Sequence, residues 1–378
     1  MSKLEQKELT LFLKPKVLKP AAQSADQITR RLAMNKIGRM IAAAHQDRTI
    51  RLYDVRNGEE IQRLKDDYLC TSMAFSPRGD ILASGGVDRI LKFWDIRTGE
   101  CIARLEGHSY PVLSIAFSPD GSRVVTSSGD TTMIVWDVGS RSKTHQLRGH
   151  SLYVVSCDWD PRGDRIVSGG VDGIIGLWDA KTGNKTQWIK EHRTAVHSVR
   201  FSTDGAKVVS TSSDLSAIVW DATGPELKMI QTLRGHSEEV RTASFSSDGS
   251  MIASGSSDKC IYVWMGSPYA ISGEGKTTSE VDGIEWFPDQ SSFVSCEGSG
   301  AIIRWDVVQM ESMLQPFRAL LREIEADSQM LRREELTRAL DELRGQYDPE
   351  VLQDRQVFYL IWQCKKALGL LKGKPKED

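Results

Sequence analysis

The chain has 378 residues, of which 40% are hydrophobic and 26% are charged, and its formal net charge is −2. This composition is ordinary for a soluble globular protein. A net charge so close to zero gives no overall electrostatic reason to expect nucleic acid or an anionic membrane as the partner, although it leaves a local basic patch open.

The cysteine and hydropathy patterns point to the interior of the cell. No apolar run approaches the roughly 18 residues that span a bilayer, and the first residues lack the apolar stretch of a secretory signal. The six cysteines lie tens of residues apart without a C-x-x-C pair, which argues against a zinc site and a disulfide framework. We therefore expect an intracellular, cytoplasmic protein without a bound metal, and a nuclear location stays open.

The first 24 residues form an arm that carries three lysines next to prolines (Lys14, Lys16, Lys19). An extended, solvated segment is one interpretation, and contact with RNA phosphates is another. The alternating segment Thr10–Leu18 predicts a strand that closes the last repeat of the fold described below. The segment Glu311–Pro316 competes for the same place, and the sequence leaves both alternatives open.

Residues 25–312 consist of one unit of roughly 42 residues that recurs seven times. Each unit ends in a strand with an aromatic residue near its end, and successive aromatics are 41, 42, 42, 42, 44 and 41 residues apart: Tyr53, Trp94, Trp136, Trp178, Trp220, Trp264 and Trp305. Asp follows the aromatic except after Trp264. Short β-rich runs separated by Asp-Gly and other Gly-containing turns predict antiparallel hairpins with four strands per unit.

Four-stranded units repeated seven times predict a closed, seven-bladed β-propeller, an all-β fold with only short edges. The offsets within the units are regular. A His lies 9 residues before a core aromatic in four units, the turn Asp follows that aromatic by 13 residues, and the closing Trp follows the Asp by 6. These residues resemble the WD-repeat β-propeller family over about three quarters of the chain.

The resemblance implies a hydrogen-bonded tetrad of His, Ser or Thr, Asp and Trp in each complete blade. Carried onto the matching positions, the tetrads are His108, Thr126, Asp130 and Trp136; His150, Ser168, Asp172 and Trp178; His192, Ser210, Asp214 and Trp220; and His236, Ser254, Asp258 and Trp264. The first, second and last units depart from the pattern, with Asp66 and Thr277 at two of the His places. These three units are adjacent where the ring closes, and we predict that they form its least stable arc.

Recurring Ser, His and Asp residues look like catalytic triads, but an active site occurs once and a scaffold motif recurs with each blade. The segment Ala270–Thr277 resembles a phosphate-binding loop, yet the repeat register places a strand after it where such a loop needs a helix. We expect no catalytic residue, no cofactor and no enzymatic activity.

In the resembled family, one face of the propeller commonly binds peptides through positions three and five residues after the tetrad His and one before the turn Asp. For the second to seventh units these are Leu69, Thr71 and Val87; Pro111, Leu113 and Gly129; Tyr153, Val155 and Val171; Ala195, His197 and Ser213; Glu239, Arg241 and Ser257; and Glu280, Asp282 and Gly298. An apolar sector in units two to four thus faces a charged, mainly acidic sector in units six and seven. We expect a partner segment that pairs a hydrophobic anchor with a basic group. The alternative is that these side chains only pack around the channel mouth or against the protein's own tail.

Residues 313–378 change to a helical period and predict a helical tail with apolar stripes. Such a short helical segment does not bury much core by itself. Docking on its own propeller, pairing with a partner helix and self-association all remain open, with Phe358 and Trp362 as the expected contact residues.

The resemblance implies a non-catalytic scaffold or adaptor that organises the protein subunits of a larger complex. Two alternatives stay open: a reader of one short linear peptide motif on the propeller face, and an RNA-associated subunit of a ribonucleoprotein assembly.

Overall fold

The computed structural model describes residues 11–19, 29–35 and 39–309, and six residues of the tail (Thr337, Arg338, Asp341, Ile361, Trp362 and Cys364). Those six have helical backbone but do not define a helix, so the predicted helical tail lies otherwise outside the described residues. The chain divides into two compact units, Pro15–Asp306 and a second that joins Met1–Lys14 to Val307–Asp378. In the described part of the chain, no helix has the length and apolarity required to cross a membrane.

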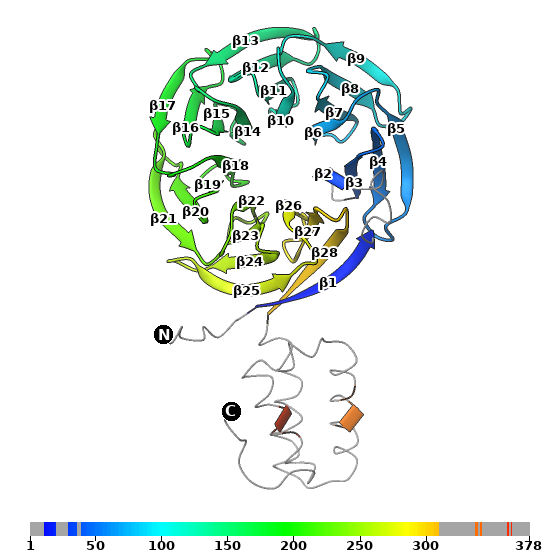
Figure 1. Ribbon diagram of the computed structural model, residues 1–378, viewed down its shortest axis with the longest axis vertical. Coiled ribbons are helices and arrows are strands. Elements are labelled where there is room, and N and C mark those ends of the chain that lie inside the picture. The colour runs from blue at the N-terminus through cyan, green and yellow to red at the C-terminus, as the bar shows by residue number, and fades with distance from the viewer. Residues whose placement is uncertain are drawn as a thin grey trace. The chain divides into compact units, whose positions relative to one another are not determined.

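Seven four-stranded antiparallel sheets are arranged radially around a centre, which confirms the predicted seven-bladed β-propeller (Figure 1). We number the blades 1 to 7 in chain order, from β2–β5 as blade 1 to β26–β28 with β1 as blade 7. In blades 1 to 6 the strands run in chain order from the centre to the rim, and in blade 7 the order is β26, β27, β28 and then β1 (Figure 1).

The bounds of the strands are regular from blade to blade. The innermost strands are β2 (Thr29–Met34), β6 (Cys70–Phe75), β10 (Val112–Phe117), β14 (Val154–Trp159), β18 (Val196–Phe201), β22 (Val240–Phe245) and β26 (Val281–Trp286). The second strands are β3 (Met40–His45), β7 (Ile81–Gly86), β11 (Arg123–Ser128), β15 (Arg165–Gly170), β19 (Lys207–Ser212), β23 (Met251–Ser256) and β27 (Ser292–Glu297). The third strands are β4 (Thr49–Asp54), β8 (Leu91–Asp95), β12 (Thr132–Asp137), β16 (Ile175–Asp179), β20 (Ser216–Asp221), β24 (Cys260–Met265) and β28 (Ile302–Gln309). The outer strands are β5 (Glu60–Lys65), β9 (Cys101–Leu105), β13 (Ser142–Arg148), β17 (Lys185–Ile189), β21 (Lys228–Arg234), β25 (Ala270–Lys276) and β1 (Leu11–Lys19).

The core lies between neighbouring blades, because the second strands and most residues of the third strands are buried on both faces. Leu91 and Phe93 of blade 2 pack in one cluster with Val112, Ile134 and Trp136 of blade 3. Burial of each such side chain contributes roughly 1.5–3 kcal/mol. The blades therefore stabilise one another, and each depends on both of its neighbours.

Ring closure uses the N-terminal strand. β1 pairs with β28 as the outer strand of blade 7, so the segment near Thr10–Leu18 takes the place that the sequence had left open. The competing segment Glu311–Pro316 lies outside the described residues. On the adjoining side, Ile41 and Tyr53 of blade 1 pack against Phe287 and Ile302 of blade 7.

Each of blades 3 to 6 contains a chain of buried hydrogen bonds between its strands. In blade 5, the Trp220 indole Nε1 donates to Ser210 Oγ at 2.9 Å, His192 Nε2 lies 2.8 Å from that oxygen, and His192 Nδ1 lies 2.9 Å from Asp214 Oδ2. The same bonds of 2.8–3.1 Å recur in blades 3, 4 and 6. A neutral imidazole that donates from Nδ1 and accepts at Nε2 gives the indole N–H, the hydroxyl and both imidazole nitrogens of each tetrad a hydrogen-bond partner.

Blade 2 has Asp66 where these blades have His, and a lysine fills the vacant space. The Lys92 ammonium, on β8, contacts both the Asp66 carboxylate and Asp88 Oδ2, the latter at 2.6 Å. All three side chains are almost fully buried. Burial alone would lower the pKa of Lys92, but hydrogen bonds from its ammonium to the two carboxylates raise it, so the group stays charged.

Blades 1 and 7, which also lack the tetrad His, form other polar contacts around the tetrad positions. In blade 1, Arg51 pairs with the turn residue Asp47, and the Tyr53 hydroxyl lies 3.1 Å from His45 Nε2. Arg51 and Lys92 occupy the same position, two residues before the closing aromatic. In blade 7, the buried Glu297 carboxylate accepts a hydrogen bond of 2.6 Å from Thr278 Oγ1 and another from Ser299.

We predict that Ser210→Ala lowers the free energy of unfolding by about 1–3 kcal/mol, because the Trp220 N–H loses its acceptor and His192 loses its donor. Urea unfolding followed by tryptophan fluorescence measures the change. Ser237→Ala is the control, because this serine is exposed and its side chain makes no hydrogen bond with another described residue. Equal stability of the two variants would contradict the prediction.

For blade 2 we predict that Lys92→Ile costs about 3–5 kcal/mol, because two buried carboxylates then lose their shared cation. Adding Asp66→His to this variant should recover much of the loss, since Ile134 and Ile218 occupy the Lys92 position in blades that contain a complete tetrad. Urea unfolding of both variants makes the test. A double variant no more stable than the single one would show that blade 2 cannot accept the His arrangement.

Stability should fall as the pH is lowered from 7.5 to 5.5. Burial lowers the pKa of His192 and of His236, and the neighbouring Asp214 and Asp258 offset this only in part. The unfolded chain takes up protons near the ordinary His pKa of about 6.5, so the contribution is full above that pH and is lost below it. The slope of unfolding free energy against pH should be shallower in His236→Gln, and an unchanged slope would refute this assignment.

Candidate functional site

The loops at one edge of the blades bring the predicted recognition positions together. One backbone hydrogen bond recurs in these loops in blades 2 to 7. The donor is the N–H of the residue just before the turn Asp (Ser299 in blade 7), and the acceptor is the carbonyl of the residue three positions after the tetrad His position. These bonds, of 2.9–3.1 Å, join Val87 to Leu69, Gly129 to Pro111, Val171 to Tyr153, Ser213 to Ala195, Ser257 to Glu239 and Gly298 to Glu280. We call the surface formed by these pairs the upper face.

Blades 2 to 4 carry a concentration of exposed apolar side chains on the upper face. Six of the large hydrophobic residues that are exposed in the described structure lie in these loops: Tyr68, Val87, Tyr110, Leu152, Tyr153 and Val171. We call this set the apolar arc. Other predicted residues on these blades, Leu69, Pro111, Leu113 and Val155, are half-buried.

Three members of the apolar arc were missed by the sequence analysis. Tyr68, Tyr110 and Leu152 all lie two residues after the His place of their blades, one position away from those that were considered. Their exposed fractions are 50%, 54% and 48%. Large apolar residues at one register in three consecutive units were the signal that would have found them.

Blades 5 to 7 place charged residues around the mouth of the central channel, but most of these charges are paired. Arg241 pairs with Asp282 and also donates to Ser257 Oγ at 2.8 Å. His197 Nε2 lies 2.6 Å from Ser213 Oγ and 3.6 Å from Glu239, and burial lowers the pKa of this histidine.

The Glu280 carboxylate differs from these groups, because it forms no ion pair with another described residue. It lines a hollow of about 440 Å³ together with Leu69, Val87, Arg241 and Asp282. Leu69 and Val87 of blade 2 and Glu280 and Asp282 of blade 7 therefore line the same hollow, and blade 1 lies between these two blades in the ring.

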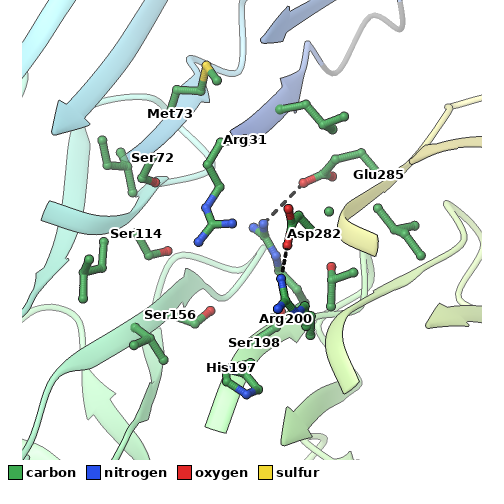
Figure 2. Close-up of a pocket in the computed structure, with 18 of the residues that line it drawn as sticks. Arg31, Ser72, Met73, Ser114, Ser156, His197, Ser198, Arg200, Asp282 and Glu285 are labelled. Carbon is green, nitrogen blue, oxygen red and sulfur yellow. Dashed lines mark hydrogen bonds and ion pairs between the residues drawn. The ribbon is translucent and has the colours of Figure 1, made fainter. Parts of the chain in front are cut away.

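The channel below this mouth is lined by the innermost strands of all seven blades and encloses about 280 Å³ (Figure 2). Ser72, Ser114, Ser156 and Ser198 contribute hydroxyls on one side (Figure 2). Arg200, two residues after Ser198 on β18, reaches Glu285 of blade 7 at 3.3 Å. Among the described residues, no group of three His, Cys, Asp or Glu side chains is placed to hold a metal ion.

The Ser–His–Asp combinations are not accessible for nucleophilic catalysis. The hydroxyls of Thr126, Ser168, Ser210 and Ser254 are fully buried, and each accepts the indole N–H of its own blade. A substrate atom cannot approach these oxygens in the folded blade. The phosphate-loop-like segment forms strand β25, Ala270–Lys276, instead of a loop that leads into a helix.

Of the two contact residues expected in the tail, Phe358 lies outside the described residues. Trp362 is described as a half-buried residue with helical backbone. The predicted role of both residues stays a prediction.

Comparison with known proteins agrees with the geometry. The family model for the WD domain, G-beta repeat, matches residues 58–95, 99–137, 141–179, 183–221 and 227–265, which together make up about half of the chain. Each match runs from the outer strand of one blade through the third strand of the next, and the strands involved in ring closure fall outside the matches. No curated protein matches the chain. The chain therefore belongs to the WD-repeat family.

Proposed function

We propose that this WD-repeat propeller is a non-catalytic scaffold that organises protein subunits of a larger complex and that binds one of them on its upper face. Propellers of this family typically act as protein-interaction scaffolds. The observation that carries the proposal is the apolar arc, six exposed hydrophobic side chains gathered on neighbouring blades of a rigid ring. Contiguous exposed apolar surface usually marks a contact site, and tyrosines are frequent interface anchors.

The charged mouth supports a partner segment that also carries a basic group. Glu280 has no ion-pair partner among the described residues, and the half-exposed Glu239 lies 3.6 Å from His197, its ion-pair partner in the described part of the chain. Since the pKa of His197 is lowered, it is mostly neutral at pH 7 and does not balance Glu239. A lysine or arginine placed beside a hydrophobic anchor would therefore meet uncompensated negative charge.

The tail is proposed as a second contact. The helical period that the sequence predicts over residues 313–378 would carry more apolar surface than so short a segment could bury by itself. Phe358 and Trp362 are the residues that we assign to this contact. The propeller and the tail would then hold different subunits.

We predict that Tyr153→Ala combined with Leu113→Ser reduces the recovery of at least one co-purifying protein by tenfold or more, because it removes apolar area from the upper face. The measurement is quantitative identification of what co-elutes with the full chain from native extract under mild conditions. The thermal unfolding profile of the variant shows whether the fold is kept.

Met229→Ala is the matched control, because Met229 is equally exposed but lies on outer strand β21, away from the upper face. The control should keep every partner. Retention of all partners by the double variant would reject the upper face as the contact site.

A further inference from the structure

One hollow on the upper face is lined by both apolar and acidic side chains. It has a volume of about 440 Å³. Blade 2 contributes Leu69, Cys70 and Val87, and blade 7 contributes Glu280 and Asp282. Val87 also belongs to the apolar arc, so the hollow adjoins the surface to which we assign partner binding. A concave site that combines apolar side chains with a few polar groups is the usual form of a ligand pocket.

Glu280 carries the charge of this hollow that is left uncompensated. In the described part of the chain, neither of its carboxylate oxygens forms a hydrogen bond or an ion pair. The two arginines that line the hollow are directed to other groups. Arg241 pairs with Asp282, and Nε of Arg31 donates to the Thr71 carbonyl at 3.2 Å. A cationic group of a partner would therefore meet a carboxylate that no described residue neutralises.

The absence of a side chain at Gly298 sets the position of this carboxylate. A Cβ atom at Gly298 would lie 2.7 Å from Glu280 Oε1 and 2.8 Å from Glu280 Cδ, so the carboxylate rests directly against the Gly298 backbone. Gly298 does not adopt a positive φ, and the backbone conformation therefore does not require glycine. Any larger residue at this position would push the carboxylate away.

We infer that this hollow holds a lysine side chain of the partner segment, with its ammonium at Glu280 and its methylene groups along Leu69 and Val87. Lysine stems pack on apolar surface while the charged end stays near water. Because Oε1 of Glu280 rests against the backbone, a donor that needs a single oxygen suits this carboxylate better than a planar guanidinium that needs both.

This inference rests on the proposed protein-binding function and names one residue of the partner and its place on the upper face. Since Val87 contributes to both the hollow and the apolar arc, one short segment can place its lysine in the hollow and its hydrophobic anchor on the arc.

The test uses the full chain and three small probes: the N-methylamides of Nα-acetyl-lysine, Nα-acetyl-norleucine and Nα-acetyl-arginine. Norleucine keeps the aliphatic stem and lacks the ammonium. Two-dimensional amide spectra follow the signals of Val87 and Gly298 during each titration. The lysine probe should shift both signals saturably, the norleucine probe should not, and the arginine probe should bind more weakly than the lysine probe.

Two variants test the role of the carboxylate. Glu280→Gln removes the charge at constant shape and should weaken binding of the lysine probe about fivefold or more, as followed at Val87. Gly298→Ala keeps the charge, displaces the carboxylate and should weaken binding as well. Glu238→Gln is the matched control, because Glu238 is an exposed glutamate in the corresponding loop of blade 6 and does not line the hollow. It should bind as the wild type does, and thermal unfolding checks that all three variants stay folded.

The inference is overturned if the lysine probe gives no saturable shift with the wild-type chain, or if the norleucine or arginine probe binds as tightly. Wild-type affinity in Glu280→Gln or Gly298→Ala would overturn it as well.

Failure of this inference is separable from failure of the proposed function. If the Tyr153 and Leu113 double variant loses native partners but the lysine probe does not bind, the scaffold stands and the lysine site is rejected. If the lysine probe binds through Glu280 but the double variant retains every native partner, the lysine site stands and the apolar arc is rejected as the contact site of the complex.

Discussion

The structure depends on one hydrogen bond, from a buried indole N–H to a hydroxyl on the neighbouring strand. It is present in every blade closed by tryptophan, at 2.8–2.9 Å, including blades 2 and 7, which have no tetrad histidine. A large aromatic side chain is needed to fill the space between blades, and its polar atom must then be paired. The hydroxyl meets that requirement, and in blades 3 to 6 the histidine pairs in turn with the hydroxyl and with the turn Asp.

The irregular blades show that the requirement can be met in more than one way. Lys92 in blade 2 and Arg51 in blade 1 bring a cation to the turn carboxylate from the third strand, where the regular blades bring an imidazole from the preceding loop. Two of the three blades in the arc that the sequence suggested to be weakest therefore contain ion pairs in place of the missing histidines, and blade 7 uses the hydrogen bonds to Glu297. A buried pair of this kind is weak support for stability by itself, but losing one partner is costly.

Repetition explains what could be predicted from the sequence. The period and the offsets within each unit place the strands, the tetrad residues and the upper-face positions, because each of these is a local relation copied from unit to unit. The pairing of β1 with β28 could not be read in this way, since it joins the two ends of the propeller, and neither could the contact of Lys92 with Asp66, since the units with a complete tetrad have neither side chain at these positions. The ion pair between Arg241 and Asp282 of the next blade also could not be read from the sequence. This pair makes the channel mouth less acidic than we expected. Tyr110 was within reach of the same register but lay one position away from those considered.

The closing strand also has a consequence for how the chain is made. Residues 11–19 leave the ribosome before the strands of all seven blades that follow them in the chain, yet their partner strand, residues 302–309, emerges only after all other blades have been synthesised. The outer edge of the seventh blade therefore cannot form until translation of the ring is nearly complete. Until then, an unpaired β-strand segment stays available to other polypeptides in a crowded cell.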